Sequence, residues 1–94
     1  MTTDPIPVLH NTTAGRFEAT VEGHLCVAEY EVAADGVVTF THTHVPPELR
    51  GRGIAEKLVR AALAWARTEG HRVVPACSYV EAFIRRNAEY QDLL

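Results

Sequence analysis

The residues best suited to chemistry in this sequence form one short loop, residues 50–55, which reads Arg-Gly-Arg-Gly-Ile-Ala. Glycines have no Cβ and accept positive φ angles, so Gly51 and Gly53 allow backbone N–H groups to converge on a small anion. A helix that begins directly after such a loop adds its unpaired N–H groups and the positive end of its dipole. Arg50 and Arg52 add guanidinium donors that suit phosphate oxygens. The loop therefore predicts a pyrophosphate-binding site.

The spacing within the loop excludes several common nucleotide-binding motifs. A Walker loop needs Gly-Lys-Ser/Thr, which is absent, and a dinucleotide fingerprint would need glycine where Glu56 stands. A minor-groove hook would need basic flanks, whereas Glu48 and Glu56 flank this Arg-Gly-Arg and the net charge is −3, so we expect no nucleic-acid partner. What fits is R-x-x-G-x-A, formed by Arg50, Gly53 and Ala55. The plain alternative is a steric glycine turn with solvated arginines.

Three blocks in order carry a resemblance to a known family: residues 42–46 (His-Thr-His-Val-Pro), the loop 50–55, and residues 77–79 (Cys-Ser-Tyr). Together they resemble the short single-domain GNAT-like N-acetyltransferases, sometimes called Gtn-type, from about residue 16 to the C-terminus. The resemblance implies a compact mixed α/β fold (α+β), acetyl-CoA as cosubstrate and an amine as acceptor. It implies that Cys77 and His42 are catalytic. The cofactor-binding residues that it implies are Val45, Arg50, Gly51, Arg52, Gly53, Ile54, Ala55 and Tyr79.

Cys77 lies between a proline-bearing segment and a predicted helix. If Ser78 caps that helix, the sulfur lies near unpaired N–H groups and a positive dipole, which favour a nucleophilic thiolate. Two roles follow: the thiol accepts the acetyl group covalently, or it lines the site while the amine attacks acetyl-CoA directly. A small buried core residue is the structural alternative. Cys26, in the middle of a strand pattern, is predicted to be core.

His42 and His44 are predicted to share one face of a strand just before the loop. An amine must lose a proton before it can attack, and histidine is the side chain that exchanges protons near neutral pH. His42 matches the family block and is the first candidate for the base, whereas His44 stands where the family often has an acidic residue. Both could instead be surface residues of an edge strand. No third ligand has convincing spacing, so we expect no metal.

Alternating apolar residues predict three antiparallel strands over about residues 16–21, 24–32 and 37–45. Glu22-Gly23 and Asp35-Gly36 are typical of the tight turns between them. A helical period then predicts a helix over about 52–69, with a stripe formed by Ile54, Leu58, Ala61, Ala62 and Trp65. Residues 72–76 read as a strand parallel to the third, and Ser78 to Glu81 as a capping box that opens a second helix through about residue 87. Residues 89–94 are expected to form a last turn.

Pro75 is unusual because proline in a strand removes a hydrogen-bond donor. Pro46 would leave the neighbouring strand unpaired in the same way, so we expect these two strands to part and leave a slot for an extended ligand. In the resembled superfamily, such a slot holds the pantetheine arm of coenzyme A. Lys57 and Arg60 could reach an outer phosphate of that ligand, or could be solvated helix residues.

Length and composition are those of one globular domain: 94 residues, 47% hydrophobic and 22% charged. We expect a flexible arm over residues 1–15, with a short strand around Val8, and a single domain over 16–94. No apolar run approaches the roughly 20 residues that span a bilayer, and the N-terminus lacks the pattern of a signal peptide. We therefore expect a cytoplasmic protein with no membrane partner and with free thiols.

The sequence as a whole predicts an N-acetyltransferase that moves an acetyl group from acetyl-CoA to an amine, either on a small molecule or on a protein lysine or N-terminus. Because the sequence pattern shows no early helix pair, which walls the acceptor side in larger GNAT domains, a protein acceptor is favoured. A monomer and a homodimer both remain open. The alternatives are a non-catalytic acyl-CoA-binding module and a ligand-free interaction scaffold.

Overall fold

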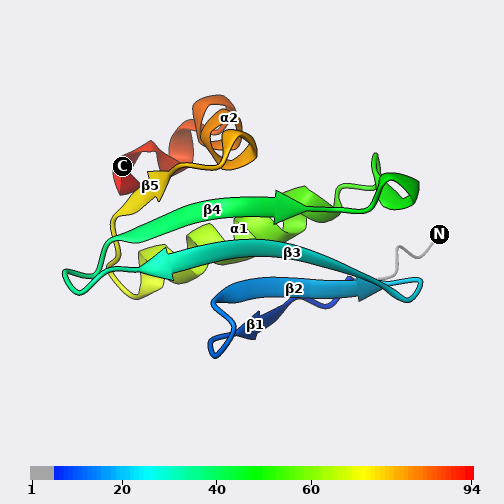
Figure 1. Ribbon diagram of the computed structural model, residues 1–94. Coiled ribbons are helices and arrows are strands. Elements are labelled where there is room, and N and C mark those ends of the chain that lie inside the picture. The colour runs from blue at the N-terminus through cyan, green and yellow to red at the C-terminus, as the bar shows by residue number, and fades with distance from the viewer. Residues whose placement is uncertain (1–5) are drawn as a thin grey trace.

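The computed structural model describes residues 6–94, which form one five-stranded sheet whose strand order follows the chain (Figure 1). The first four strands pair antiparallel and the fifth is parallel to the fourth. Their bounds are β1 (Leu9–Asn11), β2 (Arg16–Val21), β3 (His24–Val32), β4 (Val38–His44) and β5 (Val73–Pro75). The antiparallel meander plus one parallel strand confirms the predicted mixed α/β fold class.

Two α-helices and two short 3-10 helices complete the described part of the chain. They are η1 (Pro47–Leu49), α1 (Ile54–Thr68), α2 (Ser78–Arg86) and η2 (Ala88–Leu93). Gly70 ends α1 in a left-handed conformation, with a φ of 73°, and the N–H of His71 donates to the carbonyl of Ala66 at 2.8 Å. The expected capping box of α2 does not form: Cys77 is the N-cap, no side chain caps the helix, and Glu81 pairs with Arg85 instead.

One core lies between α1 and the face of the sheet that α1 covers. Cys26 is fully buried in it, as predicted. The buried stripe of α1 is wider than the predicted one, because Val59, Leu63 and Ala66 also face the sheet. Trp65 was predicted to be core. It is instead half-buried at the edge of the cluster, where its ring packs against the ring of Tyr30. The opposite face of the sheet has no helix across it in Figure 1.

A β-bulge interrupts β4 next to the site. Tyr30 pairs with Phe40, but the preceding residue of β3, Glu29, pairs with His42, so Thr41 is the extra residue. Since side chains alternate along a strand, one extra residue moves every later side chain of β4 to the other face.

The bulge decides which side chains of β4 point toward α1. Thr43 pairs with the fully buried Ala28, so its side chain lies on the helix-covered face. His42 and His44 therefore point to the uncovered face, with their rings stacked at a centroid distance of 6.2 Å. The two histidines do share one face, as predicted.

β4 and β5 separate beside the bulge, as the prolines predicted. Their pairing ends at Phe40 and Pro75, and the N–H of Cys77 donates to the carbonyl of Phe40 at 2.8 Å. β4 continues to His44 with only β3 beside it, while the chain after β5 turns into α2 (Figure 1). The result is an unpaired strand edge four residues long, from Thr41 to His44.

Part of the expected N-terminal arm is a strand. β1 pairs with β2, and the His10 ring stacks on Phe17 at 4.0 Å and approaches Trp65 at 4.8 Å. His10 Nε2 lies 2.5 Å from the Tyr30 hydroxyl. These contacts attach residues 9–11 to the domain at the position where a short strand was expected. Residues 1–5 of the expected arm lie outside the described residues.

His10 should make folding stability depend on pH, because burial lowers its pKa from the ordinary value of 6.5. A histidine whose folded-state pKa is depressed contributes stability above its unfolded pKa, and this contribution is lost as the pH falls through the folded-state pKa. We expect the free energy of unfolding to decline between about pH 7 and pH 5, measured by urea unfolding. His10→Phe, which keeps the aromatic contact, should flatten this decline, whereas His24→Phe at an exposed position should leave it intact. Equal slopes in both variants would contradict the assignment.

Candidate active site

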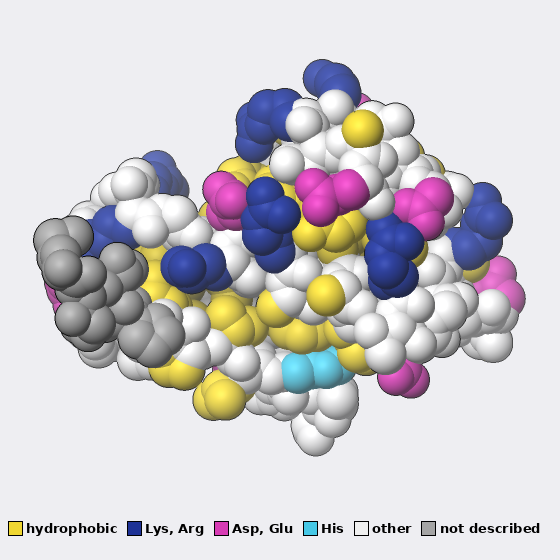
Figure 2. Space-filling model, turned by 180° about the vertical axis from the view of Figure 1, so that it is seen from behind, with side chains coloured by type: hydrophobic (Ala, Val, Ile, Leu, Met, Phe, Trp, Pro, Cys, Tyr) yellow, Lys and Arg dark blue, Asp and Glu magenta, His cyan; other side chains and the backbone are white. Residues whose placement is uncertain are grey.

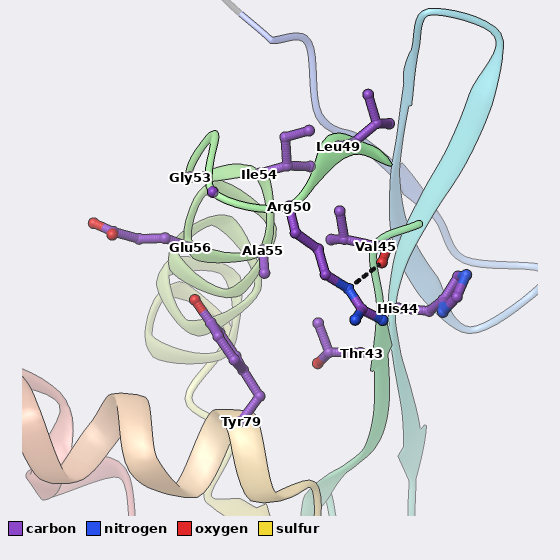
Figure 3. Close-up of a pocket in the computed structure, with 11 residues that line it drawn as sticks. Thr43, His44, Val45, Leu49, Arg50, Gly53, Ile54, Ala55, Glu56 and Tyr79 are labelled. Atoms are coloured by element: carbon purple, nitrogen blue, oxygen red, sulfur yellow. Dashed lines mark hydrogen bonds between the residues drawn. The ribbon is translucent and has the colours of Figure 1, made fainter. Parts of the chain in front are cut away.

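A cavity of about 400 Å³ opens where β4 leaves β5, between the start of α1 and the start of α2. Figure 2 views the molecule from the side of α1 and shows a hollow between two raised parts of the surface, with Lys and Arg side chains on both of them. The walls of the cavity come from the end of β4, the following loop, the first turn of α1 and one tyrosine of α2 (Figure 3). The residues that line it are Thr43, His44, Val45, Leu49, Arg50, Gly51, Gly53, Ile54, Ala55, Glu56 and Tyr79.

The N-terminus of α1 supplies backbone donors to this cavity. Gly53 is the N-cap, with a φ of 76° and no side-chain cap, and Gly51 has a φ of 86°. The first helical hydrogen bond runs from the N–H of Lys57 to the carbonyl of Gly53, so the N–H groups of the preceding turn have no acceptor within the helix. A Cβ added to either glycine would meet no protein atom within 4 Å. The residues present therefore fit an anion: open space lies beside uncapped donors.

The two arginines of the loop have different environments. The Arg50 side chain lies along the cavity, and its Nε donates to the carbonyl of Val45 at 3.1 Å (Figure 3). Arg52 does not line the cavity; its guanidinium pairs with Glu22 in the turn between β2 and β3. This pairing lowers the pKa of Glu22, chiefly through the hydrogen bond from Arg52. The side chain of Arg52, which was predicted to contact phosphate, therefore pairs with Glu22 outside the cavity in this structure.

Cys77 lies at the point where the strands part, next to the cavity. Its Sγ is 3.4 Å from the hydroxyl of Thr43, and the side chain is half-buried. Thr43 lines the cavity and so connects the thiol to it. Thr43 was not among the predicted site residues, because simple alternation along the strand places it on the other face; only the bulge brings it here.

The structure does not bring His42 together with Cys77. His42 is exposed and points away from α1, on the opposite side of β4 from Thr43. His44 borders the cavity through its position at the end of β4, but its ring is directed away from the cavity (Figure 3). The thiol and the imidazoles lie at the same end of the sheet, but the thiol is on the helix-covered face and the imidazoles are on the other.

Tyr79 crosses from α2 toward the first turn of α1 and lines the cavity, as predicted (Figure 3). Burial raises its pKa, with a smaller contribution from the Glu56 carboxylate, so the phenol stays protonated and can donate a hydrogen bond. Glu56, on the exposed side of the first turn of α1, also lines the cavity, where it accepts a hydrogen bond from Arg60 at 3.0 Å.

Arg60 is partly exposed and also connects three elements. Besides Glu56, it donates to the hydroxyl of Tyr90 at 3.2 Å and to the side chain of Asn87 at 3.5 Å. Its guanidinium also stands over the Phe83 ring, 5.1 Å from the centroid. These contacts tie α1 to α2 and η2, and thereby fix the wall that carries Tyr79.

The strands of the sheet follow the order of the chain, the last two part, and an uncapped helix N-terminus lies beside the gap. These features define the class of N-acetyltransferase folds. The chain belongs to the GCN5-related N-acetyltransferase family, whose sequence model matches residues 16–93.

Similar proteins occur in vertebrates. The chain is 35% identical over 85 residues to Protein NATD1 of Bos taurus, covering 88% of this chain and 75% of that protein. It is 33% identical to Protein NATD1 of Homo sapiens with the same coverage, and 31% identical over 88 residues to that of Danio rerio, covering 92% and 80%. A GCN5-like protein of Staphylococcus aureus, solved by NMR, superposes with a TM-score of 0.76 at 22% identity, covering 94% of this chain and 86% of that one. This last likeness bears on the fold alone.

None of the helices in residues 6–94 is both long and apolar enough to cross a bilayer. Within the same residues, no group of three or more His, Cys, Asp or Glu side chains is placed to hold a metal ion.

Proposed function

We propose that this chain transfers an acetyl group from acetyl-CoA to an amine. Acetyl-CoA supplies the acetyl group as a thioester, whose carbonyl carbon the amine attacks and whose sulfur leaves. The observation that carries the proposal is the coincidence of two features at one cavity: the uncapped N-terminus of α1 and the unpaired edge of β4. The helix N-terminus suits a diphosphate, and the free strand edge suits an extended chain that carries amide groups.

In this proposal, the backbone of residues 51–56 and the guanidinium of Arg50 bind the diphosphate, while the side chain of Arg52 stays with Glu22. The free edge of β4 from Thr41 to His44 orients the extended arm by main-chain hydrogen bonds, and Val45, just after it, lines the cavity. Tyr79 donates its phenolic proton toward the sulfur end of the cavity. His42 remains the proposed base, acting from the uncovered face of the sheet.

We propose direct attack by the amine rather than an acetylated Cys77. The hydrogen-bond partner of the thiol among the described residues is the hydroxyl of Thr43, which is not a base at neutral pH. A covalent route would need a group that removes the thiol proton. Cys77 then lines the site and keeps the hydroxyl of Thr43 in place.

Replacing Cys77 with alanine should therefore lower turnover less than about tenfold, which corresponds to less than about 1.4 kcal/mol of barrier. The measurement is steady-state release of coenzyme A, with affinity for coenzyme A followed in parallel by calorimetry. Thr43→Val, which keeps the shape and removes the hydroxyl, is the matched comparison and should show a similar effect. Complete loss of turnover in Cys77→Ala with intact binding would contradict direct attack and support the covalent route.

The proposal as a whole is tested by thermal unfolding with and without acetyl-CoA. Ligand at 100 times its Kd stabilises a binding fold by about 2.7 kcal/mol, which is readily seen as a higher Tm. No shift with acetyl-CoA would remove both the enzyme and the binding module, and would leave an interaction scaffold. A shift without coenzyme A release from any amine would favour the acyl-CoA-binding module, which is the second candidate because His42, the proposed base, does not line the cavity.

A further inference from the structure

The sheet face opposite α1, which we call the open face, is uncovered in the described part of the chain. Side chains of β2, β3 and β4 stand on it in cross-strand rows. One row contains Arg16, Glu29 and His42, and the next contains Glu18, Val27 and His44. Directly opposed side chains in such rows have Cβ atoms about 4.5–5.5 Å apart, so each row is a set of close neighbours.

The open face carries unneutralised negative charge. The guanidinium of Arg16 is engaged by Glu18, with 2.6 Å between Nε and Oε2. That contact lowers the pKa of Glu18, mainly through the hydrogen bond from Arg16. Glu29 and Glu31 have no side-chain hydrogen bond or ion pair among residues 6–94. The negative charge of this face therefore favours the binding of a cationic partner.

The open face is continuous with the candidate active site. His44 belongs to the cavity wall, yet its ring is directed away from the cavity (Figure 3). It stacks with the ring of His42 on the open face, at a centroid distance of 6.2 Å. The same four residues of β4 form the free strand edge, with Thr43 on the cavity side and the two histidines on the other. A group bound beside His42 thus reaches the strand edge from the side opposite Cys77.

We propose that the open face is the docking surface for the acceptor, and that the acceptor is a primary amine on a basic polypeptide segment, with Glu29 binding its ammonium group. This rests on the proposed function and names its substrate class. A flat sheet face suits an extended peptide better than a small metabolite, which needs enclosing walls. Exposed Leu25 and Val74, 43% and 45% accessible, add apolar surface for a chain to cover.

The test uses the full chain labelled with ¹⁵N and two peptides that share one lysine, Ac-Gly-Arg-Gly-Lys-Gly-Arg-Gly-amide and its counterpart with Glu in place of Arg. We expect the basic peptide to shift the backbone NMR signals of Glu29, His42 and their open-face neighbours, and the acidic peptide to bind at least about tenfold more weakly. Glu29→Gln should weaken the basic peptide about 5- to 10-fold, an effect of one partly exposed charge that added salt reduces. Glu69→Gln, an exposed carboxylate at the far end of α1, is the matched control and should change nothing.

Several outcomes would overturn the proposal: equal affinity for the two peptides, signal shifts confined to the helix-covered face, or an unchanged affinity in Glu29→Gln. Shifts on the open face that depend on protein concentration without peptide would assign the face to a second copy of the chain instead. Peptide binding does not require acetyl-CoA, so the two proposals fail separately. Peptide binding to the open face with no coenzyme A release would contradict only the proposed enzymatic activity. Coenzyme A release with n-butylamine as acceptor, but no peptide binding, would contradict only the proposed docking surface.

Discussion

Replacing Gly53 with alanine is expected to weaken coenzyme A binding about 10- to 150-fold. Gly53 is the N-cap of α1, and the added methyl group would stand at the rim of the cavity, beside the N–H groups that are proposed to bind the diphosphate. Losing one charge-assisted hydrogen bond costs about 1.5–3 kcal/mol, which gives that range. Calorimetry with coenzyme A measures the affinity directly, and a thermal melt of each variant verifies that it is folded.

Gly70→Ala is the matched control for this substitution. Gly70 lies at the other end of α1 with nearly the same backbone conformation, a φ of 73° against 76°, and an added Cβ meets no atom within 4 Å in either case. Both variants should therefore lose a similar stability, about 1–2 kcal/mol, because an L-residue is forced into the left-handed region. Only Gly53→Ala should lose affinity. Equal affinity in the two variants would mean that the ligand binds elsewhere.

Replacing Phe40 with alanine should give the largest loss of stability, about 3–5 kcal/mol. Phe40 is 1% exposed and is the last residue of β4 that pairs with β5, so it fills the core directly beneath the point where the strands part. A domain of this length has roughly 5–14 kcal/mol of stability in total, so the variant would lose about a fifth of it or more.

Urea unfolding measures this loss, and Val74→Ala on the neighbouring strand is the control. Val74 is 45% exposed on the open face, and its truncation should change stability by no more than about 0.5 kcal/mol. Phe40→Leu should fall between the two, since it keeps most of the buried apolar volume. A cost below about 1 kcal/mol for Phe40→Ala would show that the end of the sheet is packed less tightly than its burial indicates.

The sequence predicted most of what local signals determine. The two tight turns, the prolines that end the strands and the glycines that flank α1 act through their own backbone preferences, so β2, β3, β4, α1 and the parting of β4 and β5 followed from single residues and their neighbours. The loop at residues 50–55 was predicted for the same reason. Tyr79 was placed at the cavity by the family resemblance, because packing arguments alone did not separate it from the core.

What the sequence did not predict depends on contacts between distant segments. The fold brings Glu22 beside the side chain of Arg52, which was predicted to bind phosphate, and η2 places Tyr90 within reach of Arg60. Neither partner can be inferred from spacing, because each lies 30 residues away in the chain. The Thr41 bulge has no local signature either: it arises from the register between β3 and β4, and with it came the unforeseen role of Thr43.

That extra residue has a consequence for how such a strand can change over time. Deleting Thr41 would restore regular pairing and leave the hydroxyl and the imidazoles on the sides where they now stand, because His42 would still pair with Glu29. Keeping Thr41 but pairing it with Glu29 in a regular ladder would instead exchange those sides. Two chains with the same letters across this segment could therefore offer an incoming amine opposite chemical surroundings, whereas two chains that differ by this one residue could offer the same ones.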